Sequence, residues 1–183
     1  MKGIEFLGTS WKRVREFPAL AKREAGHQLD RVQRGLDPTD WKPVKSVGHG
    51  VREIRIQYEG QYRVIYIASN GQAGFRRSKA RLQASVREAE IMSEKTQFES
   101  VWDALEDDPV RRENLKLRSE LMITISEAIK AHGLKQQDAA ELLHISQPRV
   151  SALLKGKIDE FRLDTLVDFA HRLGLHVSIN IAA

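Results

Sequence analysis

Four polar side chains near the C-terminal end of the chain have the types and the spacing to bind a nucleic acid. Gln147, Arg149, Ser151 and Lys155 lie within nine residues of one another in the stretch LKQQDAAELLHISQPRVSALLKG, residues 134–156. Amide and guanidinium groups pair with the edges of bases, and hydroxyl and ammonium groups bind phosphates. Such contacts require a helix that presents these side chains outward while its opposite face is packed.

The surrounding residues predict two helices joined by a sharp turn. The first helix is expected from Gln136 to Leu143, and the second follows the turn His144–Ser146 and ends at Gly156. Ser146 is expected to cap the second helix, with its hydroxyl accepting an unpaired N–H group, and Pro148 suits a first turn. Apolar positions at helical spacing predict the buried faces: Ala139, Ala140, Leu142, Leu143, Val150, Leu153 and Leu154. The alternative is an ordinary buried helical hairpin.

The remainder of the C-terminal half resembles a known family. The segment RSELMITISEAIKAHGLKQQDAAELLHISQPRVSALLKGKIDEFRLDTLVDFAHRLGLHVSINIA resembles the Cro/Xre helix-turn-helix family, and within it HigA-type antitoxins. The resemblance implies an all-α DNA-binding domain over residues 114–183 whose second helix docks in the major groove. It implies Gln136, with its neighbour Gln137, close to a phosphate, and Gln147 and Arg149 close to bases, with Ser146 at the turn.

Positive charge is concentrated in the other half of the chain. Residues 1–91 contain 18 Lys and Arg against 10 Asp and Glu, a balance of +8, whereas residues 92–183 contain 12 against 15, a balance of −3. A basic half is typical of a polyanionic partner such as RNA, although a solvated basic surface is the plain alternative.

The first half alternates between helical and extended patterns. A short helix is expected from Ser10, as its cap, to Glu16, and a longer one from Pro18 to Arg34. Residues 36–43 are expected to form a loop of turn residues. Two alternating runs, 52–58 and 61–67, predict a hairpin about Glu59-Gly60. A second turn is expected at Asn70-Gly71, with a short return strand over 72–76, and a helix over 78–91. Helices followed by an antiparallel sheet indicate an α+β domain.

This half also resembles a known family. The segments LGTSWKRVREFPALAKREAGHQLDRVQRGLDPTDWKPVKSVGHGVREIRI and YEGQYRVIYIA resemble HigB toxins of the RelE superfamily, in the phage-derived Gp49-like branch. The family is implied to consist of ribosome-dependent mRNA endonucleases, whose partners are often HigA-like proteins. The chain departs from the family after Ile67, because the apolar strand expected there is missing. We therefore interpret the N-terminal domain as a RelE/HigB-like fold, incomplete at its C-terminal end, over residues 1–91.

RNA cleavage without a metal needs a base for the 2′-hydroxyl and cations that stabilise the phosphorane. The resemblance and this chemistry point to five candidate catalytic residues: Arg63, Arg55, Arg52, Lys45 and His49. Arg63, in YRVIY, matches the strand arginine of the family best and is the candidate clamp for the scissile phosphate. Salt bridges with Glu53, Glu59 or acidic residues of the antitoxin-like half are an open alternative for Arg52 and Arg55. His49, between two glycines, could be an ordinary loop residue.

Residues 92–113 are expected to form a linker with a short amphipathic helix. Its apolar stripe is Phe98, Val101, Trp102 and Leu105, and Glu106–Pro109 should end this helix. The stripe could pack on the first half or on the helix-turn-helix domain. Leu175–Ile181 alternates like a strand, which could pair with a second copy in a homodimer or pack within its own chain.

These patterns lead to three hypotheses. The first is a fused toxin–antitoxin protein that represses transcription through operator DNA while its RelE-like half is inhibited or degenerate. The second is an active mRNA endonuclease regulated by its attached antitoxin, with mRNA and the ribosome as partners. The third is an interaction protein. No cofactor or metal is expected, because the six histidines lack ligand spacing, and the absence of cysteine and of long apolar runs predicts a cytoplasmic protein.

Overall fold

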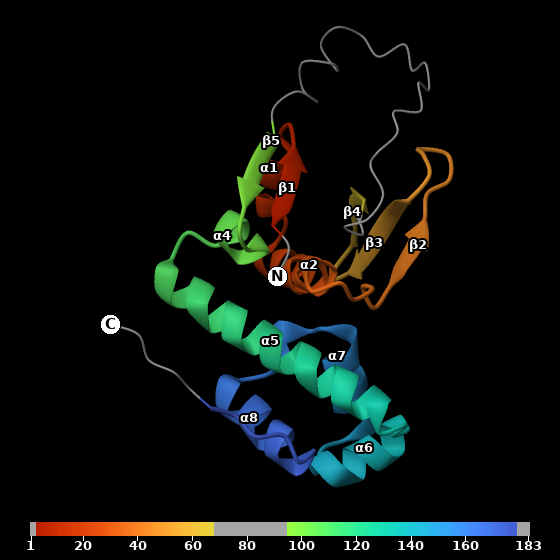
Figure 1. Cartoon of the computed structure of the whole chain (residues 1–183), viewed down its shortest axis with the longest axis vertical. Coiled ribbons are helices and arrows are strands. Elements are labelled where there is room, and N and C mark those ends of the chain that lie inside the picture. The colour runs from red at the N-terminus through yellow and green to blue at the C-terminus, as the bar shows by residue number, and fades with distance from the viewer. Residues whose placement is uncertain (1–2, 68–94, 179–183) are drawn as a thin grey trace, which may run out of the picture. The chain divides into compact units, whose positions relative to one another are not determined.

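The chain forms two compact units, of which a computed structural model describes residues 3–67 and 95–178 (Figure 1). The first unit ends at Leu105 and the second begins at Glu106. The described part of the segment 92–113, expected as a linker with a short amphipathic helix, is divided between the two units. Lys95–Leu105 belongs to the first unit, and the long helix of the second unit already begins at Pro109.

In its described residues, 3–67 and 95–105, the first unit combines three helices with two small antiparallel sheets. The elements are β1 (Ile4–Leu7), α1 (Ser10–Arg15), α2 (Ala19–Gln33), β2 (Trp41–Pro43), β3 (Val51–Gln57), β4 (Gln61–Ile67), β5 (Lys95–Phe98) and α4 (Val101–Leu105). The two helices predicted before the sheet and the hairpin about Glu59-Gly60 are present, but Thr9, and not Ser10, occupies the N-cap of α1. Residues 41–43, expected as loop, form strand β2 because they pair with residues 52–54 of β3.

Strands β2, β3 and β4 form a sheet in that order. Its inner face carries Ile54, Ile56 and Val64, all buried, and this is the face that the alternating pattern predicts. The outer face carries charged residues, among them Arg55 and Arg63, which stand directly opposite each other across β3 and β4. Glu59 and Gly60 form the turn of this hairpin, both with positive φ.

The second sheet joins the two ends of the unit. Strand β5 pairs antiparallel with β1, with Ile4 opposite Phe98 and Leu7 opposite Lys95. Helix α4 follows directly and packs on α1 and α2. Val101, Trp102 and Leu105 are buried there, so the apolar stripe of this segment packs on the first half of the chain. Sequence analysis predicts neither β1 nor β5.

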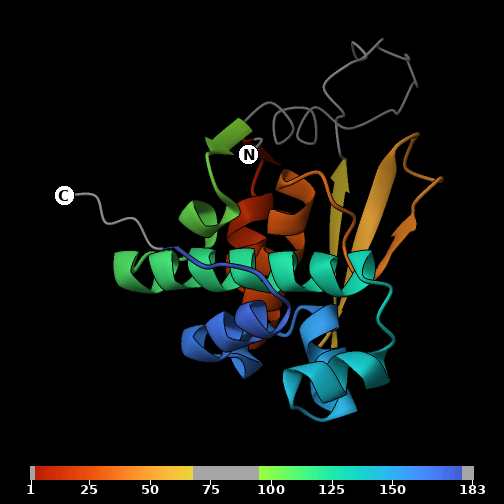
Figure 2. The same ribbon diagram turned by 60° about the horizontal axis from the view of Figure 1, so that its bottom comes forward.

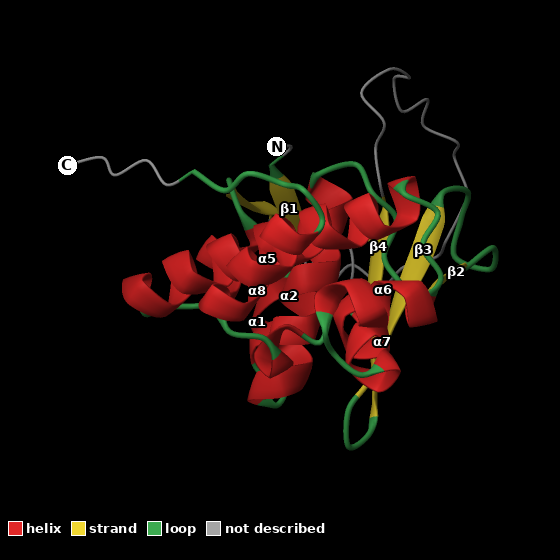
Figure 3. Cartoon of the chain, turned by 90° about the horizontal axis from the view of Figure 1, so that it is seen from below, coloured by secondary structure: helices red, strands yellow, loops and turns green. Residues whose placement is uncertain are grey.

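The second unit is helical in its described part (Figure 3). Its elements are α5 (Pro109–Ala131), α6 (Gln136–Leu143), α7 (Gln147–Lys155), a 3₁₀ turn η1 (Ile158–Glu160) and α8 (Leu163–Arg172). Helix α5 begins sharply because the carboxylate of Asp108 accepts the N–H of Val110 at 2.9 Å, and Pro109 follows this cap. Its buried side, which includes Met122, Ile125 and Ile129, packs on α8 and α7 (Figure 2).

The predicted helices α6 and α7 have the bounds that sequence analysis gives them. Two packing residues differ, because Leu142 is 39% exposed and Leu154 is half-buried, while the other predicted positions are buried. Residues 175–178 are not a strand, and 179–181 lie outside the described residues. The expected turn at Asn70-Gly71, the return strand over 72–76 and the helix over 78–91 also lie outside them.

Candidate functional site

Helix α7 presents one polar stripe to solvent. Gln147, Ser151 and Lys155 follow one another at intervals of four residues, which places them on one side of an α-helix. Gln147 and Lys155 are exposed and Ser151 is half-buried. The opposite side is packed, because Val150 and Leu153 are fully buried. The stripe therefore has the form needed to enter a groove, with an amide first, a hydroxyl next and an ammonium last.

Arg149 lies on a different side of α7. At 100° per residue it is about 200° around the helix from Gln147. Its Nη2 donates to the carbonyl oxygen of Glu160 at 2.9 Å, and its guanidinium stacks on Phe161 with 4.9 Å to the ring centroid. The residue is exposed, but its side chain holds the loop that follows α7. The structure thus separates Arg149 from the stripe with which sequence analysis groups it.

A second arginine, missed by sequence analysis, supports the same loop. Nη1 of Arg118, from α5, donates to the carbonyl oxygens of Ile158 at 3.2 Å and Phe161 at 3.1 Å. These contacts tie the end of α7 to the longest helix of the unit. The sequence around Arg118 does not indicate that it supports this loop, because its partners are backbone atoms about forty residues away along the chain.

The turn between α6 and α7 is tight and exposed. His144 ends α6 with φ 55° and ψ 44°, a left-handed conformation that favours glycine. Ser146 occupies the N-cap of α7 as predicted, but its hydroxyl accepts no capping hydrogen bond. The expected capping contact is therefore wrong, and the exposed hydroxyl remains available to a ligand.

The first turn of α6 is also exposed to solvent. Gln136 and Gln137 are the first two residues of the helix and are both exposed. The carboxylate of Asp138 accepts the backbone N–H of Lys135 at 3.2 Å, which fixes the first turn. A helix start with free amide side chains suits a phosphate, because the terminal N–H groups and the helix dipole both favour an anion.

The candidate cations of the first unit do not gather at one place. Arg55 and Arg63 share the outer face of the sheet, whereas Arg52 points to the inner side. Lys45 and His49 are exposed in the loop between β2 and β3. The structure therefore brings together two of the five predicted catalytic residues.

The cations of the sheet are also paired with carboxylates, but Arg52 and Arg55 pair with Asp37 and Asp40, which are not the partners expected for them. Arg55 binds Asp40 with two guanidinium nitrogens, and Nε of Arg63 lies 3.8 Å from Oε1 of Glu53. Both arginines are about half exposed. The Arg55–Asp40 pair is exposed on both sides, and such pairs contribute only about 0–1 kcal/mol, so a phosphate could displace Asp40 at small cost. The carboxylate of Glu53 beside Arg63 is buried, so this argument does not extend to it.

Arg52 is held more firmly. Its guanidinium lies 4.2 Å from the ring centroid of Trp41, and Nη1 donates to Asp37 at 2.6 Å. The neighbouring Tyr66 hydroxyl raises the pKa of Arg52 further above its ordinary value, and Asp37 acts in the same direction. Burial raises the pKa of the Tyr66 hydroxyl, although the Arg52 cation beside it acts against this shift. Arg52 is thus a permanent cation that contacts Asp37 in the loop before β2 and the aromatic ring of Trp41 in β2.

Comparison with known proteins identifies each unit. Residues 12–75 match the family of phage-derived Gp49-like proteins, and residues 104–182 match a helix-turn-helix domain family. No curated protein matches the chain. The chain therefore joins a Gp49-like, toxin-type α+β domain to a helix-turn-helix domain of antitoxin type. The predicted fold of both halves is confirmed.

Two general features complete the description. Among the described residues, none of the helices combines the length and apolar character needed to cross a membrane. Within the same ranges, histidines and carboxylates do not form a cluster of three or more that could hold a metal ion.

Proposed function

We propose that the protein is an autorepressor of the toxin–antitoxin class. In this proposal the helix-turn-helix unit binds operator DNA near its own gene, and the toxin-type unit is an inhibited or degenerate mRNA interferase. The observation that carries the proposal is the polar stripe of α7, in which Gln147 and Lys155 are exposed and Ser151 is half-buried, while Val150 and Leu153 pack the helix onto its unit.

The stripe supports a specific arrangement on DNA. The amide of Gln147, at the start of α7, would pair with a base edge in the major groove, because an amide can donate and accept at once. Lys155, two turns further, and the start of α6 at Gln136 and Gln137 would contact phosphates. Arg149 would act mainly by positioning α7, since its guanidinium is already engaged with Glu160 and Phe161.

A homodimer suits this role. Helix-turn-helix proteins commonly bind two half-sites about one helical turn apart, and dimer symmetry then matches operator symmetry. The expected length of protected DNA is thus two half-sites, which footprinting of the complex measures directly.

The decisive experiment compares operator binding by the protein and by Gln147→Ala. Loss of one good base contact should weaken specific binding by about 5- to 150-fold, corresponding to about 1–3 kcal/mol, while binding to unrelated DNA stays the same. Fluorescence anisotropy with DNA from upstream of the gene measures both. Gln57→Ala, at an exposed glutamine of the sheet, is the matched control and should change neither affinity. Unchanged specific binding by Gln147→Ala would overturn the recognition role of α7.

The toxin-type unit is proposed to be inhibited or degenerate because its candidate cations are dispersed and paired. An active ribosome-dependent endonuclease is the second candidate, and one observation favours it: Arg55 and Arg63 stand side by side on an exposed face. Inducing the full chain in cells and mapping mRNA ends distinguishes the two. Cleavage that Arg63→Ala abolishes would establish the enzyme, whereas intact mRNA supports the inactive form.

A further inference from the structure

The segment Lys95–Leu105 contacts the rest of the first unit as a bound peptide contacts a receptor. Its strand β5 adds to the edge of β1 over four residue pairs, and β1 has no other strand neighbour among the described residues. Phe98 packs edge-on against Phe6 and Trp11, with ring centroids 6.0 and 6.2 Å apart. Addition of a strand to a free edge, with aromatic anchors, is a common mode of peptide recognition.

The helical part of the segment, α4, packs against α2. Trp102 is 1% exposed and lies against Gly26, where a Cβ atom would come within 2.7 Å of the indole ring. The absence of a side chain at Gly26 therefore creates the space that the ring fills. Val101 and Leu105, both buried, complete the apolar contact.

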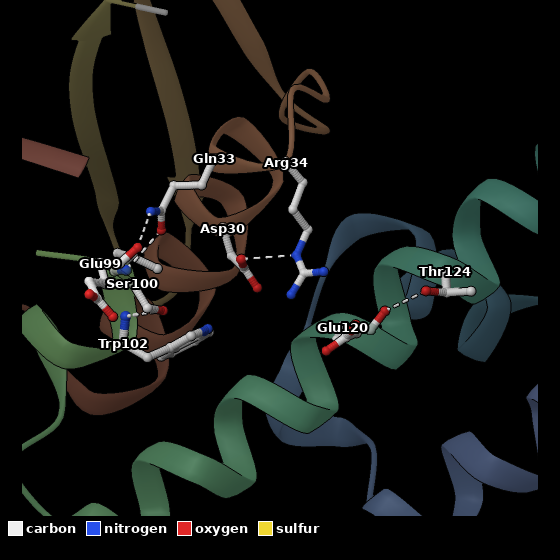
Figure 4. A network of polar contacts seen from close by, with 9 residues as sticks. Asp30, Gln33, Arg34, Glu99, Ser100, Trp102, Glu120 and Thr124 are labelled. Carbon is white, nitrogen blue, oxygen red and sulfur yellow. Dashed lines mark hydrogen bonds and ion pairs between the residues drawn. The ribbon is translucent and has the colours of Figure 1, made fainter. Parts of the chain in front are cut away.

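A side-chain amide clamps the junction between β5 and α4. Nε2 of Gln33 donates to the carbonyl oxygen of Glu99 at 3.0 Å, and its Oε1 accepts the N–H of Val101 at 2.8 Å (Figure 4). Gln33 is buried, and its bond with Val101 is shielded from water, whereas its bond with Glu99 is partly buried. One amide thus satisfies a donor and an acceptor of the segment's backbone, in the manner of a strand neighbour.

The segment also carries its own local structure. The backbone N–H of Ser100 donates to the carboxylate of Asp103 at 3.1 Å, and the hydroxyl of Ser100 accepts the N–H of Trp102 at 3.3 Å. This reciprocal capping, together with the bond from Val101 to Gln33, defines the start of α4. At the other end, Arg15 donates to the carbonyl oxygen of Ala104 at 3.3 Å.

We propose that residues 3–67 form a receptor for the strand–helix segment 95–105, and that the segment is a separable ligand which this chain carries in cis. The segment lies outside the Gp49-like match and overlaps the first two residues, 104 and 105, of the helix-turn-helix match. It thereby provides the non-covalent attachment of the antitoxin-type half to the toxin-type half. The same surface accepts the segment when it is supplied in trans. The proposal does not depend on operator binding or RNA cleavage.

The test cuts the folded protein between receptor and ligand. A protease recognition sequence is inserted between residues 80 and 81 of the full chain, and the two pieces are run together on gel filtration after cleavage. We expect them to co-elute at low micromolar concentration, because the contacts above remain after the chain is cut. Separation of the pieces at that concentration would overturn the proposal.

A peptide exchange experiment identifies the surface. Fluorescent peptides of residues 95–106 are added to the cleaved protein and binding is followed by anisotropy. A peptide with Trp102→Ala should bind about tenfold more weakly or worse, since a buried tryptophan is a typical anchor. A peptide with Lys95→Ala is the control and should bind within about threefold of the parent, because its ion pair with Glu5 is exposed. Equal binding of the tryptophan variant would refute the assignment.

Discussion

The close approach of Gly26 to Trp102 predicts an unusual sign for a glycine-to-alanine change. In the middle of an exposed helix this change stabilises by about 0.5–1 kcal/mol, because alanine restricts the unfolded chain. At Gly26 the new Cβ would lie 2.7 Å from Cζ3 and 2.8 Å from Cη2 of Trp102. The indole is buried and cannot swing into solvent, so the ring or the helix must shift.

The magnitude follows from these opposing effects. Overpacking of a filled core typically costs about 1–3 kcal/mol. After the helix gain is subtracted, Gly26→Ala should destabilise the first unit by about 1 kcal/mol. In a Trp102→Leu background the conflicting ring atoms are gone, and the same change should be stabilising. The coupling between the two positions should then be about 1–3 kcal/mol.

Tryptophan fluorescence provides a selective assay. The three tryptophans, Trp11, Trp41 and Trp102, all belong to the first unit, so urea unfolding followed by fluorescence reports on this unit alone. Gly48→Ala is the matched control, since its Cβ would meet Val51 at an ordinary 3.5 Å and should change stability by less than about 1 kcal/mol. A Gly26→Ala effect of the same sign and size in both backgrounds would refute the packing argument.

Two further predictions concern histidines. Burial, reinforced by Arg31 and Arg34, lowers the pKa of His27 to about 3, so the folded state disfavours its protonation. Stability should be complete above the unfolded-state pKa of about 6.5 and fall below it, by about 2 kcal/mol at pH 5. Urea midpoints between pH 5 and pH 8 measure this loss, and a loss of the same size in His27→Gln would exclude His27 as its source. At the left-handed His144, substitution by glycine should stabilise the second unit by about 0.5–1 kcal/mol; circular dichroism on heating measures it, and His144→Ala should give no such gain.

The helix-turn-helix could be predicted from sequence because its signals are local. Apolar spacing, the proline at position 148 and the glycine at 156 all act within one or two turns, and α6 and α7 have the predicted bounds. The face of Arg149 was less predictable. A polar residue two positions from Gln147 looks like part of the same surface until the helical phase and the contact with Phe161 are seen.

The short strands were not predictable for the opposite reason. Strands β1, β2 and β5 have three or four residues each, too few for alternation to be distinctive. Each exists because of a partner elsewhere in the chain, and for β1 that partner is about ninety residues away. The apolar spacing around Trp102 predicted that this helix has a buried face. It did not predict the surface on which that face packs, because this depends on the space beside Gly26 in α2.

The pairing of β1 with β5 has a consequence for synthesis of the protein. Leu7 and Lys95 are neighbours in the sheet, and 88 positions separate them along the chain. At a synthesis rate of about 5–20 residues per second, roughly 4–18 s pass between the synthesis of β1 and the synthesis of its partner strand β5. Throughout that interval the N-terminal edge is open, so the toxin-type fold reaches its final form only after translation has passed the beginning of the antitoxin-type half.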